Sequence, residues 1–155
     1  MTVFATNGSK VYICTTPAAE EPANAAAYQG LTWIEVKEVE SIGTFGDTAT
    51  EITFASISDG RTRKAKGTRN AGTLELVCGI DYTDAGQTAL VNAEKTPQRY
   101  PFKVQFNDAP AGGTPSQRYF LALVGGAAEQ LDSADNVMKL NVTLWLDTAV
   151  TRVDA

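Results

Sequence analysis

The chain of 155 residues contains no histidine. Histidine is the commonest general base and a common metal ligand, so its absence removes the usual basis for acid–base catalysis or a transition-metal site. Cysteine is scarce. Cys14 and Cys78 follow no metal-binding spacing and lie among apolar residues, so we expect two reduced, buried thiols. A phosphate-binding glycine loop and a serine nucleophile elbow are also missing. We therefore expect no enzyme activity, no catalytic residue, no cofactor and no metal.

Long apolar runs are absent as well. No stretch approaches the roughly 20 residues that cross a bilayer. The first ten residues, MTVFATNGSK, lack the basic and apolar regions of a secretory signal. The composition, 43% hydrophobic and 20% charged, is ordinary for a globular protein. We expect a single domain over residues 1–155, made in the cytoplasm, with no membrane binding by this chain.

Charge is distributed unevenly along the chain. Residues 1–60 carry a net charge of −6, residues 61–72 carry +5 with no acid, and residues 73–155 carry −4. The basic segment has almost no apolar residue, so we expect an extended loop or arm at about residues 57–72. Such an arm could contact protein, stay solvated, or bind nucleic-acid phosphates. Its bases are Arg61, Arg63, Lys64, Lys66 and Arg69.

Alternation of apolar and polar residues predicts a mainly β protein. The pattern between Trp33 and Phe45 changes phase, which indicates a bulge or corner near Lys37–Glu38. Asn7-Gly8 should join residues 3–6 to residues 10–15 as a hairpin. A further segment, residues 119–124, is apolar on both faces, which predicts a strand that is covered on both sides. The segments that alternate with a period of two are residues 73–80, 102–106 and 138–146.

One helix is predicted, from Asp84 to Lys95. Asp84 stands at the N-cap position and Gln87 three residues later, which is the spacing of a capping box. Small apolar residues follow on one side of the helix, and Pro97 ends the segment. This pattern is typical of a helix that lies close against a sheet.

Acidic residues gather on the predicted strands before the basic arm. Glu35, Glu38, Glu40 and Glu51 are expected on two consecutive strands that form a hairpin. They could act as a carboxylate pair, although a solvated strand face explains them without any chemistry. The later segment LDSADN, residues 131–136, lacks the glycine and distal glutamate of a calcium loop, which predicts a polar turn.

In residues 72–95 a strand and a turn of the form D-Y-x-D-x-G-Q lead into a helix with x-A-L. The segment FLALVGGAAEQLDSADNVMKLNVTLWLD holds a final pair of long strands. Both segments resemble the tail tube (major tail) proteins of long-tailed bacteriophages of the siphophage type. By order and length of elements the resemblance extends from about Trp33 to Asp147. It implies a β-sandwich or barrel-like tail tube fold with one flanking helix and long inter-strand loops.

The resemblance also implies a function. Family members form hexameric rings that stack into the tail tube of the virion, through which genomic DNA passes into the host without specific binding. The partners would be further copies of the chain and other tail proteins, such as the tape measure and terminator, with assembly in the host cytoplasm. Glu35, Glu38, Glu40 and Glu51 would be candidates for the lumen wall, because an acidic wall repels phosphate. The arm from Arg61 to Arg69 would contact a neighbouring subunit or ring.

Two other functions fit the same sequence. One is a ring-forming tube protein of a contractile secretion system. The other is a monomeric β-sandwich binding module, for which Trp145 on a polar strand face is the one candidate platform.

Overall fold

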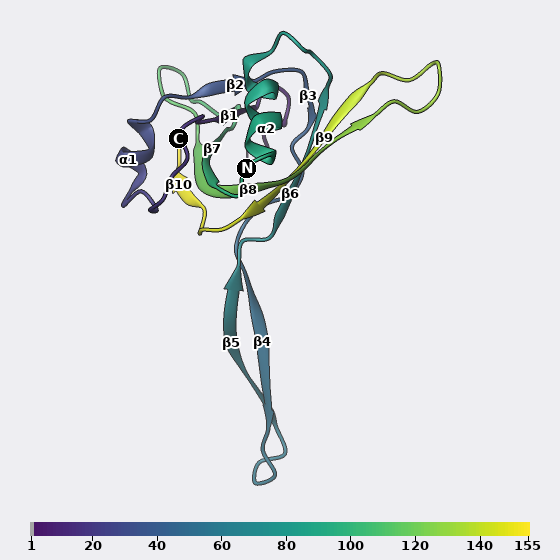
Figure 1. The fold of residues 1–155 in the computed structure, drawn as a ribbon. Coiled ribbons are helices and arrows are strands. Elements are labelled where there is room, and N and C mark those ends of the chain that lie inside the picture. The colour runs from purple at the N-terminus through teal and green to yellow at the C-terminus, as the bar shows by residue number, and fades with distance from the viewer. Residues whose placement is uncertain (1) are drawn as a thin grey trace.

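The computed structural model describes residues 2–155, which form ten strands and two helices (Figure 1). The mainly β fold predicted from the alternation is confirmed, with the short α1 added to the predicted helix α2. The elements in chain order are β1 (Lys10–Ile13), α1 (Ala25–Gln29), β2 (Ile34–Val36), β3 (Val39–Ser41), β4 (Thr48–Ala55), β5 (Thr62–Asn70), β6 (Thr73–Gly79), α2 (Ala85–Glu94), β7 (Arg99–Gln105), β8 (Gln117–Gln130), β9 (Lys139–Leu146) and β10 (Thr151–Val153).

The main sheet has eight antiparallel strands. Seven follow the order β2-β1-β7-β8-β9-β6-β3, and β10 pairs with β8. The end strands β2 and β3 are separated in the chain only by Lys37 and Glu38, so the sheet curls until its two ends meet at this corner. Glu38 has a φ of 58°, a conformation that bulky side chains rarely adopt. The predicted corner is therefore confirmed, and chain continuity instead of strand pairing brings the two ends together.

The curled sheet encloses the main core. Apolar residues at alternate positions of β6 and β9 point inward, among them Leu76 and Val142, which are both fully buried. Helix α2 adds Leu90 and Ala93 to the same cluster. Cys78 belongs to this core and Cys14 is also buried, and both thiols are free, as predicted.

The first half of β8 is buried on both faces, as its sequence predicted. Phe120 faces the main core, where its ring stacks on Phe102 with centroids 5.8 Å apart. Tyr119 faces the opposite way and stacks on Tyr28 of α1 at 5.3 Å. Trp33 packs against this second cluster and donates a hydrogen bond from Nε1 to the Tyr28 carbonyl. The helical turn before β2 therefore covers the outer face of the sheet.

Helix α2 begins at a network that ties the corner of the sheet together. The Asp84 carboxylate accepts hydrogen bonds from the backbone amides of Gln87 and Lys37. The Gln87 side chain donates to the carbonyls of Lys37 and Gly79 and accepts from the amide of Asp81. The predicted N-cap is confirmed, but Gln87 bonds across the fold instead of returning to the N-cap amide.

Two hairpins leave the body of the protein (Figure 1). Strands β4 and β5 pair only with each other and project away from the curled sheet. The far half of β8 continues with β9 alone, because β7 pairs with β8 only as far as Leu123. The predicted arm at residues 57–72 is thus one part of a longer hairpin, Thr48–Asn70, since the cationic strand β5 needs β4 as a backbone partner.

Two predicted hairpins do not form. Asn7-Gly8 does make a turn, with Ser9 N donating to Thr6 O, but β1 pairs with β2 on one edge and β7 on the other. Residues 3–6 therefore find no free edge beside β1. Likewise β3 pairs with β6 and β4 with β5, so the strands that carry the four predicted glutamates are not a hairpin.

Candidate functional site

One face of the β4–β5 hairpin, called its apolar face below, carries two large apolar side chains beside Ala65 and Arg63. Ile52 lies opposite Ala65, and Phe54 lies opposite Arg63. Directly opposed residues of an antiparallel pair share a face, so these four side chains lie on the same side. Ile52 and Phe54 are 51% and 66% exposed, and Ile57 near the tip is fully exposed. Large apolar side chains so exposed on a projecting element are typical of a protein contact surface.

The basic residues of the hairpin are partly neutralised by acids of the hairpin and by Asp47, the residue just before it. Arg61 and Lys66 make no ion pair with any group in residues 2–155. The hairpin as a whole holds two acids and five bases, whereas the rest of the chain holds 16 acids and 8 bases. A net charge of +3 on the projection therefore stands against −8 on the body. The three ion pairs are Arg63 with Asp59 at 2.7 Å, Lys64 with Glu51 at 3.3 Å, and Arg69 with Asp47 at 3.1 Å.

The four candidate glutamates are not brought together. Glu35 on β2 pairs with Lys10 at 3.8 Å, and Glu40 on β3 pairs with Lys139 of β9 at 2.9 Å. Glu38 forms the corner between these strands, and Glu51 lies on the projecting hairpin. These placements give no close carboxylate pair. Of the four, only Glu40 pairs across to β9.

Strands β6, β9 and the far half of β8 present a polar face away from the core. Thr143 donates from Oγ1 to the Glu75 carboxylate, and Asn141 donates from Nδ2 to the Gln130 carbonyl oxygen. Trp145 lies on the same face and is 51% exposed. Glu75 was not among the candidate residues predicted from the sequence. Its place in β6, between the buried Leu74 and Leu76, nevertheless shows that it points to this outer face.

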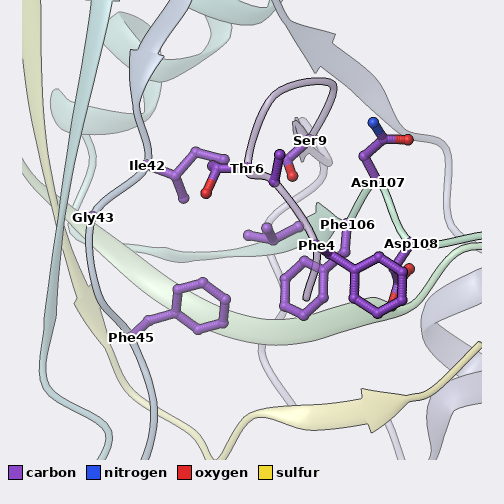
Figure 2. Close-up of a pocket in the computed structure, with 11 residues that line it drawn as sticks. Phe4, Thr6, Ser9, Ile42, Gly43, Phe45, Phe106, Asn107 and Asp108 are labelled. Carbon is purple, nitrogen blue, oxygen red and sulfur yellow. The ribbon is translucent and has the colours of Figure 1, made fainter. Parts of the chain in front are cut away.

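An aromatic cavity of about 310 Å³ opens on the body of the protein. Figure 2 shows Phe4, Phe45 and Phe106 around it, with Ile42 and Asp108 at its sides. These residues come from three segments that are far apart in the sequence, so only the tertiary structure assembles the cavity. Sequence reasoning missed this cavity, and the one available signal was Phe4, the single aromatic residue among the first nine.

The cavity has a firm floor and an exposed mouth. Phe45 packs against Phe120 with centroids 5.9 Å apart, and the Arg118 guanidinium lies 4.6 Å from the Phe106 ring centroid. Phe4 is 59% exposed at the mouth. Hydrogen bonds from the Ser116 hydroxyl and amide lower the pKa of Asp108, so this carboxylate is charged at neutral pH.

Side chains that could ligate a metal ion do not cluster in residues 2–155. No group of three or more acidic or cysteine side chains is arranged to hold a metal ion there. The turn at Asp132 is held by hydrogen bonds within the segment, such as Asn136 N to Ser133 O. Neither helix in this range is long and apolar enough to span a bilayer.

No protein-family model matches this sequence, and no curated protein does so either. Solved structures match over nearly the whole chain. A chain in the anti-feeding prophage (AFP) baseplate, 6-fold symmetrised, has a TM-score of 0.70 at 10% identity, covering 99% of this chain and 97% of that one. A chain in the PVC sheath/tube terminator structure of an extracellular contractile injection system has a TM-score of 0.70 at 12% identity, covering 99% of this chain and 98% of that one.

A phage protein shares the same architecture. The SPP1 tail tube matches with a TM-score of 0.62 at 13% identity, covering 95% of this chain and 77% of that one. Identities this low establish a common fold. The chain has the tail tube fold that phages share with related injection particles.

Proposed function

We propose that this protein is a structural subunit of a phage-type tail tube, and that its copies form hexameric rings that stack into a conduit for the genome. The observation that carries the proposal is the fold match, which spans 95–99% of the chain in these tube and tube-associated structures. The protein would act without catalysis in the virion tail, beside a tape measure and a terminator. Its work would be assembly.

The open edges of the sheet support ring formation. The short strand β3 leaves one edge exposed at one end, and β8 beyond Leu123 leaves another, because β7 stops there. Open edges pair readily with other chains unless something covers them. A contact between two different surfaces of identical subunits closes into a ring when the rotation permits. Joining the β3 edge of one copy to the β8 edge of the next would cover both.

The polar face of β6, β9 and β8 is the best lumen wall in this chain. It combines Glu75 with Glu40, the one candidate glutamate that reaches this side of the sheet through its pair with Lys139. Carboxylates along a channel keep DNA phosphates from adhering. Replacing Glu40 and Glu75 with lysine should leave the tube intact and slow genome ejection from particles that carry the variant. A density map in which another face lines the channel would contradict this assignment.

Electron microscopy of the purified protein tests the proposed function directly. We expect rings or hollow tubes at raised concentration without any added cofactor, and six-fold symmetry in averaged end views. Sedimentation velocity should show large species that grow with protein concentration. A protein that remains monomeric at every concentration, in moderate salt, would contradict the proposal and favour a monomeric binding module.

A ring at the end of a tube is the second candidate. The AFP baseplate chain and the PVC sheath/tube terminator both reach a TM-score of 0.70, above the 0.62 of the SPP1 tail tube. A subunit of a terminal ring would form single or paired rings that do not elongate. The same micrographs distinguish the two candidates, because a tube subunit gives particles of many lengths.

A further inference from the structure

We propose that the apolar face of the β4–β5 hairpin docks into the aromatic cavity of another copy of this chain. The anchors are Ile52, Phe54 and Ile57, and the receiving residues include Phe4, Phe45 and Phe106. The inference rests on the proposed function and adds the specific surfaces that meet in the assembly.

The hairpin has the properties of a segment that is stabilised by binding to a partner. A two-stranded hairpin alone in water is marginally stable, because it buries little apolar surface. Here neither strand pairs outside the hairpin, and Ile52 lies over Gly67, where an added Cβ would be 3.2 Å from its side chain, yet remains 51% exposed. Phe54 and Ile57 stay exposed. Docking would remove these side chains from water and stabilise the hairpin.

The cavity has the properties of a receptor. Its volume of about 310 Å³ lies at the lower end of pockets that bind small ligands, so it can accept one or two apolar side chains. Val104, which is almost fully buried in the core, contributes to the lining. The three aromatic rings surround the same cavity (Figure 2). An aromatic-lined depression with a firm floor is where interface anchors contribute most binding energy.

The two surfaces cannot meet within one subunit. Phe45 lies three residues before β4, so the cavity sits at the base of the hairpin, and the hairpin runs away from the body (Figure 1). A strand of eight residues spans about 26 Å, which carries the anchors well clear of their own cavity. The occupant that fits is therefore the hairpin of a second copy.

Charge favours the same pairing. The hairpin carries +3 and the remainder of the chain −8, so the projection of one copy is attracted to the body of another. Arg61, opposite Ser56 on the apolar face and without an ion pair in residues 2–155, can approach the charged Asp108 beside the cavity. The tip of the β8–β9 hairpin also exposes apolar residues, but its turn holds Asp132 and Asp135, which an acidic body repels.

Two complementary variants test the docking. Phe54→Ser with Ile57→Ser removes the anchors, and Phe4→Glu places a charge at the cavity mouth; all three side chains are exposed, so folding should be preserved. Matched controls are Val137→Ser on the other hairpin and Val3→Glu, which lies beside Phe4 but outside the cavity lining. Each test variant alone should need about tenfold or more protein to assemble, and neither control should.

Mixing the two test variants gives the sharper result. The intact hairpin of the cavity variant can enter the intact cavity of the hairpin variant, and growth then stops after one junction. Sedimentation should show a single species with twice the mass of the particle that each variant forms alone. If the hairpin variant polymerises like the wild type, or if Val137→Ser is the change that blocks assembly, this inference is wrong while the proposed function stands.

A cross-link locates the contact. Phe54→Cys combined with Phe4→Cys should form a disulfide between copies upon oxidation, because Cys14 and Cys78 are buried and do not compete. Thr53→Cys with Phe4→Cys is the control, since Thr53 points to the opposite face of the hairpin. Equal cross-linking of both pairs would overturn the assignment. A wild-type protein that never assembles would instead remove the proposed function itself.

Discussion

The indole of Trp145 lies directly against Gly125 on the neighbouring strand. A Cβ atom built on Gly125 would lie only 2.4 Å from Trp145 Cε2. The register between β8 and β9 shifts at this point, between Val124 and Gly126, so the bulge and the absent side chain together make room for the ring. A half-exposed tryptophan is thus held flat on the polar face of the sheet.

Gly125→Ala should therefore displace Trp145. Because the added methyl meets a large ring held at a strand pairing, we expect a loss of about 1–3 kcal/mol in the free energy of unfolding and a shift in tryptophan fluorescence. Urea unfolding and emission spectra measure both effects. Gly126→Ala is the control, since the nearest atom to its added Cβ is 3.8 Å away. Equal stability of the two variants would contradict the close packing.

Gln87→Ala should loosen the corner of the sheet. The change removes three hydrogen bonds and leaves the carbonyls of Lys37 and Gly79 with fewer partners in a largely buried place. Unsatisfied buried groups cost about 1–3 kcal/mol, and we expect a destabilisation in that range. Asn92→Ala, at an exposed position of the same helix, should change the midpoint of urea unfolding very little.

Gly86→Ala should push α2 away from β2. An added Cβ would lie 2.3 Å from the Glu35 carbonyl oxygen and 2.6 Å from Val36 Cα, and these backbone atoms cannot rotate aside. Alanine normally favours a helix over glycine by about 0.5–1 kcal/mol, but here overpacking of about 1–3 kcal/mol should exceed that gain. Gly30→Ala, with its nearest contacts at 3.7 Å, should be neutral or slightly stabilising. Thermal unfolding of both variants shows whether each substitution lowers or raises the stability of the fold.

The Cys78 thiol should destabilise the fold at alkaline pH. Burial, with a smaller contribution from the charge of Asp84, raises the pKa of this thiol from 9.0 to about 11. The thiol of the unfolded chain therefore ionises at a lower pH than the thiol of the folded protein. This ionisation leaves the free energy of unfolding unchanged below about pH 9 and lowers it as the pH rises toward 11. Comparing the wild type with Cys78→Ala isolates this slope from other titrating groups. An identical pH dependence of the two proteins would contradict the assignment.

Assembly should weaken when the unpaired bases of the hairpin are reversed. Arg61→Glu with Lys66→Glu leaves the three ion pairs of the hairpin in place while opposing its attraction to an acidic neighbour. Exposed ion pairs contribute about 0–1 kcal/mol each, but they repeat around a ring. Light scattering should show a higher assembly threshold, and added salt should raise the threshold of the wild type. Lys37→Glu with Arg152→Glu, on the body, is the charge-matched control, and equal thresholds in all samples would argue for a solvated hairpin.

Much of the local structure could be predicted from sequence because it depends on neighbours in the chain. The alternation in residues 73–80 and 138–146 decides which side chains face a core, and Asp84 fixes the start of α2 through the next turn of the helix. The phase change near Lys37–Glu38 indicated the corner that the positive φ of Glu38 makes. The order of elements also indicated the tail tube fold, which the solved structures share.

Pairing between distant strands was decided only by the tertiary structure. Asn7-Gly8 is a good hairpin turn, yet β7 and β2 occupy both edges of β1, and no local signal announces that competition. Glu35 and Glu51 looked like neighbours on one hairpin, but β4 pairs with β5 and carries Glu51 away from the body. The sequence by itself determined the helix, the faces of the strands and the charge of the projection, because these follow from adjacent residues. The cavity around Phe4, Phe45 and Phe106 exists only once long-range pairing has curled the sheet and brought three segments together.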